Sequence, residues 1–344
     1  MQIKDRKINA NSEPFIIAEV GINHNGELDK MLEMIEVAKN SGCDCVKFQT
    51  FKSAEFVGDK NQTYTYISQG KEITEPMYKM FERVEVKEEY WSIIKNKCDE
   101  LNIIFMSTPQ NKTDLDILLS IEIPAIKVGS DDFVNLPLLR SYKETKLPII
   151  LSCGMADFEE VKKTLKIFNS YPVALLLCTS QYPTPLEDVN LNKLITLRDT
   201  FPGLILGFSD HTQGTIAATT AVGMGAKIFE KHFTLSKNLK GPDHWFSSEP
   251  NELKLWVTSI KDAYKALGTF EIKPTKSEIK MKPIARRKIC AKTNINVGTI
   301  YTECNLNLKR ANNGLEVSFY DTIIGKKATR NILENEPIEK DDFE

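Results

Sequence analysis

The chain has 344 residues, of which 41% are apolar and 27% charged, and its formal net charge is -2. This length suggests about two domains, and this composition excludes a disordered, collagen-like or coiled-coil protein. The near-neutral charge provides no basic surface for a nucleic acid, and every apolar run is far shorter than the roughly 20 residues of a membrane span. Because the charged N-terminus lacks the apolar segment of a signal peptide, we expect a cytoplasmic protein.

Short apolar runs, each followed by a helical pattern, recur through the first two thirds of the chain. They lie at 16–20, 45–49, 103–108, 125–130, 149–154, 173–180, 205–210 and 227–233. The runs are continuously apolar rather than alternating, which is typical of parallel strands covered on both sides. Most runs begin 22 to 32 residues after the previous one, which is enough for one strand and one helix. Eight such units predict a closed (β/α)8 barrel.

Helix signals and one insertion lie between these runs. Residues 26–40 have amphipathic spacing, Asp157 and Glu160 have capping-box spacing, and Thr108 before Pro109 predicts a helix N-cap. The second and third runs begin 58 residues apart, and residues 52–85 between them are polar and rich in Tyr, Lys and Glu. We expect a long loop with some helix there, of the kind that shapes substrate pockets.

The C-terminal part of the sequence has a different character. A last helix over 252–267 completes a barrel domain at 1–267, and the aperiodic segment 268–283 predicts a linker. Residues 284–344 contain short strand-like runs separated by turn signals, which predict a small β-rich domain. Seven scattered cysteines indicate reduced, mostly buried thiols, and Cys43 with Cys45 lacks the second pair of a typical zinc site.

Polar residues end all eight predicted strands, at the face where barrel enzymes carry their active sites. They are Glu19, Lys47, Gln49, Ser107, Thr108, Lys127, Ser130, Ser152, Thr179, Ser180, Ser209, Asp210, His211, Glu230, Lys231 and His232. Lys47 and Lys127 are flanked by apolar residues, and a buried lysine needs a partner. Two inward cations in one cavity predict an anionic ligand, whereas surface lysines with snorkelling stems are the alternative.

Three further residues suggest a metal and an acid or base. His211 and His232 end neighbouring strands, where neutral imidazoles can hold a divalent metal; hydrogen-bonded core histidines are the alternative. Glu19 opens a glycine-containing loop and is the best general acid/base candidate, and an ion pair with Lys47 can coexist with that role. P-loop and dinucleotide-binding glycine motifs are absent. The residues alone therefore indicate a barrel enzyme acting on an anionic, phosphorylated small molecule, and leave the metal open.

Several motifs together resemble one family. They are Ile17-Ala-Glu-Val-Gly-Ile-Asn-His-Asn-Gly26, Val46-Lys-Phe-Gln49, Ser107-Thr-Pro109, Lys127-Val-Gly-Ser130, Tyr182-Pro-Thr-Pro185, Gly207-Phe-Ser-Asp-His211, Glu230-Lys-His-Phe233 and Gly241-Pro-Asp-His244. This set resembles the sialic acid synthases, from about residue 15 to the C-terminus. The tail is similar to the antifreeze-like, or SAF, domain that ends such enzymes.

The resemblance implies a transferase that condenses phosphoenolpyruvate with an N-acetylated sugar aldehyde and water, giving a nine-carbon ulosonic acid and phosphate. By resemblance, phosphoenolpyruvate is bound by Lys47, Thr108, Lys127, Ser130, Ser152 and Ser209. His211 and His232 would hold a divalent metal, typically Mn²⁺, with Mg²⁺ or Co²⁺ as alternatives. Glu19 would stabilise a positive centre at C2 of phosphoenolpyruvate or carry a proton.

The sugar would be bound by Gln49, Tyr182, Asp243 and Arg310. In the family, the arginine at the position of Arg310 reaches the partner subunit's active site, which implies a domain-swapped homodimer. From the sequence alone, an ordinary solvated turn arginine is the alternative interpretation.

The chain also departs from the family pattern. Gln110 stands where Phe is usual, Cys153 replaces Thr, and Ala311 replaces Pro, although each predicted ligand remains. The insertion resembles the pseudaminic acid branch, whereas Gly241-Pro-Asp-His244 resembles the sialic and legionaminic branches, so the acceptor stays open between N-acetylmannosamine and a 2,4-diacetamido-trideoxy hexose. A 3-deoxy-octulosonate or heptulosonate synthase and a sugar-binding protein without turnover are the remaining alternatives.

Overall fold

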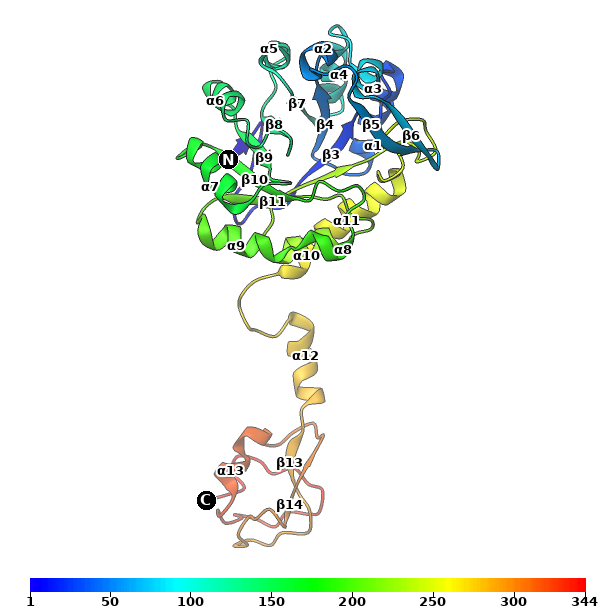
Figure 1. Cartoon of the computed structure of the whole chain (residues 1–344). Helices are drawn as coiled ribbons and strands as arrows, with labels where there is room; N and C mark the ends of the chain where they lie inside the picture. The colour runs from blue at the N-terminus through cyan, green and yellow to red at the C-terminus, as the bar shows by residue number, and fades with distance from the viewer. The chain divides into compact units, whose positions relative to one another are not determined.

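The computed structural model describes residues 1–344, and one parallel eight-stranded sheet forms its centre. Its strands are β3 (Phe15–Gly21), β4 (Cys45–Thr50), β7 (Ile104–Pro109), β8 (Ile126–Val128), β9 (Ile149–Ser152), β10 (Val173–Cys178), β11 (Ile205–Ser209) and β12 (Ile228–His232). They are ordered β7-β4-β3-β12-β11-β10-β9-β8, and the two end strands, β7 and β8, lie next to each other. The sheet therefore curls into the predicted barrel (Figure 1), and each predicted apolar run matches one strand to within two residues at either end.

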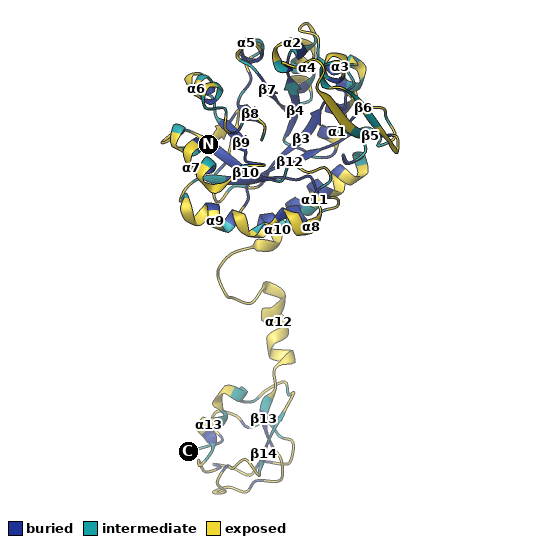
Figure 2. Cartoon of the chain, viewed as in Figure 1, coloured by how far each residue is buried: buried dark blue, intermediate teal, exposed yellow.

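Helices surround the barrel and cover its outer face with their buried sides (Figure 2). They are α1 (Leu28–Asn40), α4 (Tyr90–Glu100), α5 (Lys112–Ser120), α6 (Leu136–Glu144), α7 (Phe158–Ile167), α8 (Leu186–Val189), α9 (Asn192–Thr200), α10 (Ile216–Gly223) and α11 (Pro250–Leu267). The predicted capping box of Asp157 and Glu160 begins α7. The predicted N-cap at Thr108 is wrong, because Thr108 and Pro109 still pair with β4 and α5 begins only after Asn111.

Side chains alternate along each strand between the helices and the barrel interior. On β3, Ile16 and Ala18 pack in the cluster beneath the helices, whereas Phe15 and Ile17 pack in a second cluster inside the barrel. The next inward position after Ile17 is Glu19. Because the same alternation holds on the other strands, the interior is apolar at its base and polar at the C-terminal ends of the strands.

An N-terminal hairpin that the sequence did not reveal belongs to the interior cluster. It consists of β1 (Gln2–Ile3) and β2 (Arg6–Lys7), which pair antiparallel. Ile3 and Ile8 are buried with the inward side chains of the strands. The hairpin therefore covers apolar surface at the base of the barrel and leaves only the opposite end to receive a ligand.

The insertion after β4 is more ordered than predicted. It contains α2 (Ser53–Phe56), the antiparallel hairpin β5 (Thr63–Ser68) and β6 (Lys71–Pro76), and α3 (Met77–Val84). The expectation of a loop was wrong for the hairpin, whose strands are mostly exposed and polar and so lack an apolar pattern. Its turn uses Gln69 and Gly70 at positive φ, and the hydroxyls of Thr65 and Thr74 lie 2.8 Å apart across the strands.

The chain divides into two compact units, Met1–Gly268 and Thr269–Glu344. The second contains α12 (Lys276–Ala285), β13 (Lys288–Ala291), β14 (Leu306–Lys309), the 3-10 turn η1 (Val317–Phe319) and α13 (Tyr320–Ile323) around its own apolar core. Helix α12 begins inside the segment predicted as an aperiodic linker, with a capping box of Thr275 and Glu278. All seven cysteines are free thiols, and only Cys304 is exposed. None of the helices is both long and apolar enough to span a membrane.

Candidate active site

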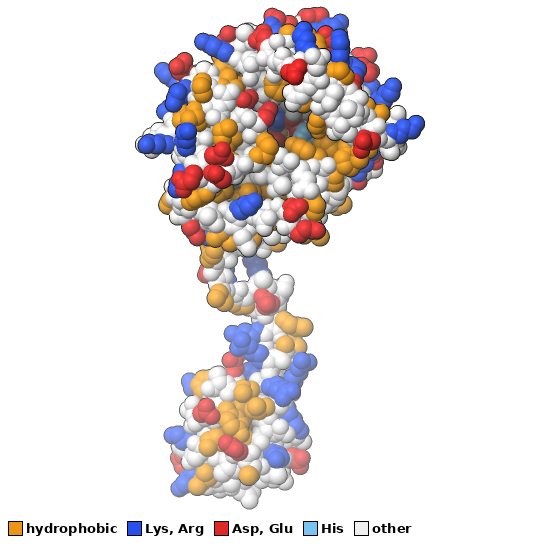
Figure 3. Space-filling view, viewed as in Figure 1, with side chains coloured by type: hydrophobic (Ala, Val, Ile, Leu, Met, Phe, Trp, Pro, Cys, Tyr) orange, Lys and Arg blue, Asp and Glu red, His pale blue; other side chains and the backbone are white.

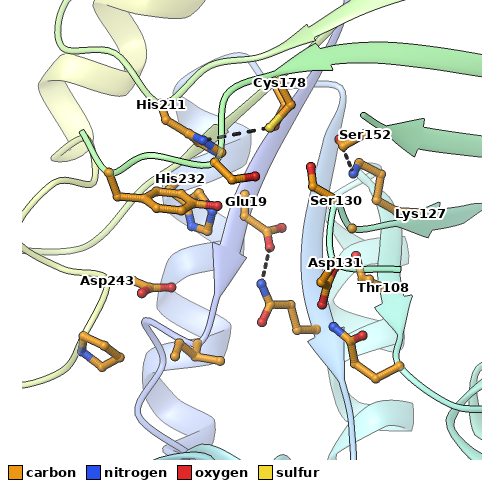
Figure 4. Close-up of a pocket in the computed structure, with 18 of the residues that line it drawn as sticks. Glu19, Thr108, Lys127, Ser130, Asp131, Ser152, Cys178, His211, His232 and Asp243 are labelled. Carbon is orange, nitrogen blue, oxygen red and sulfur yellow. Dashed lines mark hydrogen bonds between the residues drawn. The ribbon is translucent and has the colours of Figure 1, made fainter. Parts of the chain in front are cut away.

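A pocket of about 570 Å³ opens at the C-terminal ends of the barrel strands. All predicted site residues except Arg310 line it: Glu19, Lys47, Gln49, Thr108, Lys127, Ser130, Ser152, Tyr182, Ser209, His211, His232 and Asp243. Figure 3 shows the hollow with charged and histidine side chains at its bottom, and Figure 4 shows these groups converging from different strands. The volume is within the usual range for a small-molecule site.

Glu19 and Lys47 form a buried ion pair at the bottom of the pocket. Lys47 Nζ lies 2.7 Å from Glu19 Oε2 and donates a hydrogen bond to Thr108 Oγ1 at 3.1 Å. Gln49 Nε2 donates to the other carboxylate oxygen of Glu19 at 3.2 Å. The predicted Glu19–Lys47 pair is therefore present, and it leaves both groups facing the pocket.

Lys127 belongs to a second buried charge pair. Its Nζ donates to Ser152 Oγ at 2.7 Å and to Val128 O at 2.8 Å, and it lies 3.7 Å from Glu230 Oε2. Ser209 Oγ donates to Glu230 Oε1 at 3.2 Å. Two lysines are thus each paired with a carboxylate in one cavity, beside several hydroxyls. An anionic ligand would compete with these carboxylates for the lysines.

Burial and mutual attraction set the ionisation of these groups. Burial raises the pKa of Glu19 to about 7, although the charge of Lys47 opposes the shift. Burial lowers the pKa of Lys127, and Glu230 only partly offsets that effect. Burial also favours the neutral form of Glu230, but the charges of Lys127 and Lys47 outweigh it and hold the pKa of Glu230 below its usual value. The two carboxylates therefore have separated pKa values, as acid/base sites often do.

His211 and His232 lie beside each other near the C-terminal ends of the adjacent strands β11 and β12, with ring centroids 5.6 Å apart (Figure 4). His211 Nδ1 lies 2.8 Å from Thr179 O, which can only accept a hydrogen bond, so Nδ1 carries the hydrogen and Nε2 is the nitrogen left for a ligand. The buried Nδ1 of the His232 ring has no hydrogen-bond partner, and burial lowers the pKa of the ring well below its ordinary value. Burial also favours the neutral form of His211, but Cys178 and the Thr179 carbonyl outweigh it and raise the pKa of His211 above its usual value. In their neutral forms, the two imidazoles fit a divalent metal.

The structure contains no cluster of three or more His, Cys, Asp or Glu side chains suited to a metal. His211 and His232 would therefore be the only two protein ligands of this type, and water and substrate oxygens would fill the remaining positions.

The remaining sugar-site candidates are divided between the two units. The Tyr182 ring lies 4.2 Å from that of His211, between centroids, and the carboxyl of Asp243 lines the same pocket. Burial raises the pKa of Asp243 to about 6. Arg310 is exposed in the second unit, just after β14, and makes no ion pair there.

Glu230 is one of the polar strand-end residues, but the sequence patterns predict no role for it. Glu230 precedes His232 by two residues, so both point into the barrel, and this two-residue spacing is the signal that could have identified it. Cys178 also lines the pocket, with its sulfur 4.0 Å from His211 Nδ1.

A buried pair on the outer side of the barrel supports the two histidines. Asp210 and Lys231, which directly precede His211 and His232, join through Oδ2 and Nζ at 3.2 Å. Trp256 on α11 donates to the same oxygen of Asp210 at 2.8 Å. The ion pair therefore connects the ends of β11 and β12 at the positions that carry the imidazoles.

We expect Lys231→Met to lower the free energy of unfolding by about 3–5 kcal/mol, because Asp210 would remain as a buried charge without its cation. Urea unfolding measures the change. Lys265→Met is the matched control, since the exposed pair of Lys265 with Asp262 contributes at most about 1 kcal/mol. Equal effects of the two substitutions would contradict this role of Asp210 and Lys231.

His24, near the pocket, makes folding sensitive to acid. It is 1% exposed and its Nδ1 accepts a hydrogen bond from Gly26 N at 2.9 Å, and burial lowers its pKa to about 3 from 6.5. Its contribution to stability is complete above pH 6.5 and is lost as the pH falls towards 3. We expect protonation of His24 to lower the free energy of unfolding by about 3 kcal/mol between pH 6.5 and pH 4. His24→Gln, compared with the unsubstituted chain in urea at both pH values, should flatten this dependence.

A parallel barrel whose strand ends join two lysines, two carboxylates, hydroxyls and a histidine pair defines an enzyme of small anionic substrates. Residues 34–272 match the NeuB family and residues 286–344 match the SAF domain, and the chain belongs to the NeuB family. It is 38% identical to the N,N'-diacetyllegionaminic acid synthase of Legionella pneumophila, covering 92% of this chain and 91% of that protein. It is 32% identical to the pseudaminic acid synthase of Helicobacter pylori, covering 96% and 98%.

A solved structure gives the same relationship. The N-acetylneuraminic acid synthetase of Leptospira borgpetersenii, in complex with citrate, matches with a TM-score of 0.73 and 32% identity, covering 82% of this chain and 94% of that one. The predicted barrel, SAF domain and membership of the sialic acid synthase family are confirmed. The prediction of a transferase that condenses phosphoenolpyruvate with an N-acetylated sugar is also confirmed.

Proposed function

We propose that this synthase condenses phosphoenolpyruvate with N-acetylmannosamine or a 2,4-diacetamido-trideoxy hexose inside the barrel pocket. The observation that carries the proposal is the placement of two buried lysines, Lys47 and Lys127, against one cavity in a chain of the NeuB family. Two cations beside hydroxyl groups suit a ligand that carries both a phosphate and a carboxylate. The product would be a nine-carbon ulosonic acid.

Phosphoenolpyruvate would lie between the two charge pairs. Its anionic groups would take hydrogen bonds from the lysines that now contact Glu19 and Glu230, and from the hydroxyls of Thr108, Ser130, Ser152 and Ser209. Binding would exchange carboxylate partners for substrate oxygens, so the lysines stay paired throughout. A fixed set of donors of this kind costs little reorganisation during the reaction.

The proposed reaction forms one carbon–carbon bond and uses one water molecule to release phosphate. C3 of phosphoenolpyruvate attacks the aldehyde carbon, the aldehyde oxygen gains a proton, and C2 becomes electron-poor. Water then adds at C2, and the bond between C2 and the phosphate oxygen breaks to release phosphate. Glu19, whose pKa is raised to about 7 by burial, is suited to stabilise the electron-poor C2 or to accept the proton of the water.

A divalent metal would be held by His211 and His232, with Mn²⁺ as the first candidate and Mg²⁺ or Co²⁺ as alternatives. When bound, it supplies Lewis-acid polarisation of the aldehyde carbonyl. The chain's part is to present two imidazoles, one of which is oriented by the Thr179 carbonyl.

The function is tested by phosphate release from phosphoenolpyruvate with Mn²⁺ and each candidate sugar, with a chelator control. In ¹⁸O-labelled water, the label should enter the sugar acid and the released phosphate should stay unlabelled, because the bond that breaks is between carbon and oxygen. Labelled phosphate would indicate hydrolysis at phosphorus and overturn the mechanism. Absence of phosphate with every sugar would overturn the function.

The remaining sugar contacts would come from Gln49, Tyr182 and Asp243, and from Arg310 of a second copy in a domain-swapped homodimer. Arg310 is exposed and has no partner in its own chain, which supports this role. We expect Arg310→Ala and Lys127→Met copies each to be inactive alone and to regain activity when refolded together, because mixed dimers combine one intact barrel with one intact arginine. Activity that does not return on mixing would place Arg310 outside the partner's site.

A further inference from the structure

The insertion after β4 builds one wall of the pocket. Five of its side chains line the cavity, together with one from the loop after β3: Phe56, Tyr64, Met77, Met80, Phe81 and Ile22. The five residues of the insertion come from α2, β5 and α3. These elements follow the C-terminal end of β4 and therefore lie at the mouth of the pocket rather than at its base. Figure 3 shows hydrophobic side chains gathered along the rim of the hollow. We call these six residues the apolar wall.

The apolar wall is held in place from two sides. Phe81 packs edge-on against Phe51 and Phe56, with centroids 5.1 and 5.0 Å away. At the far end of the hairpin, Gln69 Nε2 donates to Asn238 O at 2.9 Å, and Gly241 N donates to Ser68 Oγ at 3.2 Å. The insertion is thus fixed to the loop that carries Asp243, and the wall is a built surface of the pocket.

The chemistry of the apolar wall differs from that of the strand ends. Lysines, carboxylates, hydroxyls and imidazoles gather at the strand ends, whereas Tyr64 carries the only polar side-chain atom of the wall. The reacting aldehyde carbon must approach the strand ends, where phosphoenolpyruvate is expected. The end of the sugar that is remote from the aldehyde is then directed towards the mouth and the wall.

We propose that the apolar wall selects an acceptor whose remote end carries methyl groups, namely a 6-deoxy hexose with a second acylamido group. This inference rests on the proposed function and names its acceptor. A methyl group at C6 and the methyl of a second acetamido group would both bury apolar surface against methionine and phenylalanine side chains. A C6 hydroxyl would lose its water there, and the Tyr64 hydroxyl is the only side-chain partner that the wall could offer it.

The preference should be moderate in size. An apolar pocket discriminates against an added hydroxyl by about 10²-fold, because the hydroxyl loses hydration without a steric clash. We therefore expect kcat/KM to be about 10²-fold higher for N-acetyl-6-deoxymannosamine than for N-acetylmannosamine, two sugars that differ only at C6. A 2,4-diacetamido-2,4,6-trideoxy hexose should be better still.

The test compares these sugars in the full chain and in two variants. Met77→Gln places an amide on the apolar wall at nearly constant size, at a half-buried position that tolerates it. Ile67→Gln is the matched control, because Ile67 lies in the same insertion, on β5, but does not line the pocket. Phosphate release is measured at saturating phosphoenolpyruvate, and the KM of phosphoenolpyruvate is measured separately.

The expected result is a preference for the 6-deoxy sugar that shrinks about tenfold in Met77→Gln, with the KM of phosphoenolpyruvate unchanged and Ile67→Gln unaffected. Equal kcat/KM values for the two sugars, or a preference that Met77→Gln leaves intact, would overturn the inference while leaving the proposed function in place. Failure of every sugar to release phosphate would instead overturn the proposed function and this inference with it.

Discussion

Replacing Lys127 with methionine should lower kcat/KM for phosphoenolpyruvate by at least about 10²- to 10³-fold while leaving the fold intact. Lys127 is 2% exposed, and its ammonium group is the only donor to Ser152 Oγ. Its loss removes a preorganised positive charge from the part of the pocket where the substrate anion is expected, and such groups contribute about 10²- to 10³-fold each. Steady-state phosphate release measures the change.

The control for Lys127→Met is Lys163→Met, which removes an exposed lysine from α7. Circular dichroism and urea unfolding establish whether each variant is folded. In the variant, Glu230 loses its cation and can take up a proton, so the fold need not retain a buried charge. Near-normal turnover in a folded Lys127→Met variant would remove Lys127 from the active site.

Chelation of divalent metal should lower phosphate release by about 10³-fold, because Lewis-acid polarisation contributes several kcal/mol to such reactions. His232→Gln should weaken Mn²⁺ binding by more than about 100-fold, since even residues that only orient metal ligands contribute 10- to 100-fold. Electron paramagnetic resonance of free Mn²⁺ measures binding without relying on turnover. The titration is run with phosphoenolpyruvate, which can supply oxygen ligands.

The matched histidine control is His244→Gln. His244 is also buried, but its Nδ1 lies 2.6 Å from Thr234 Oγ1 and its ring does not line the pocket. This variant should bind Mn²⁺ as the unsubstituted chain does. Equal Mn²⁺ affinity in His232→Gln and His244→Gln would show that the imidazole of His232 is not a ligand.

The sequence was most informative where buried strands repeat. Each run such as 173–180 is apolar because both faces of the strand are covered, so the number and order of the strands could be predicted locally. The polar residue at the end of each run then identified the pocket, because parallel strands bring their C-terminal ends to the same side. Glu19, Lys47 and Lys127 were found in this way.

Local patterns failed where stability comes from distant contacts. The polar hairpin at 63–76 has no apolar alternation, and contacts such as that of Gln69 with Asn238 fix it to a distant loop. The sequence Thr108-Pro109 predicts the start of a helix, but pairing with β4 keeps both residues in a strand. An isolated β-strand gains little stability from its own residues, so the neighbouring strand decides whether the segment forms a strand.

By itself, the sequence determined the barrel, the SAF tail and the polar strand ends, because these follow from short-range periodicity and from motifs. Only the tertiary structure decided which carboxylate faces which lysine, that Glu230 joins the site, and that the insertion lines the pocket with apolar side chains. The physical reason is that ion pairs and pocket walls are formed by residues tens to hundreds of positions apart, and their distances are set by the packing of the whole barrel.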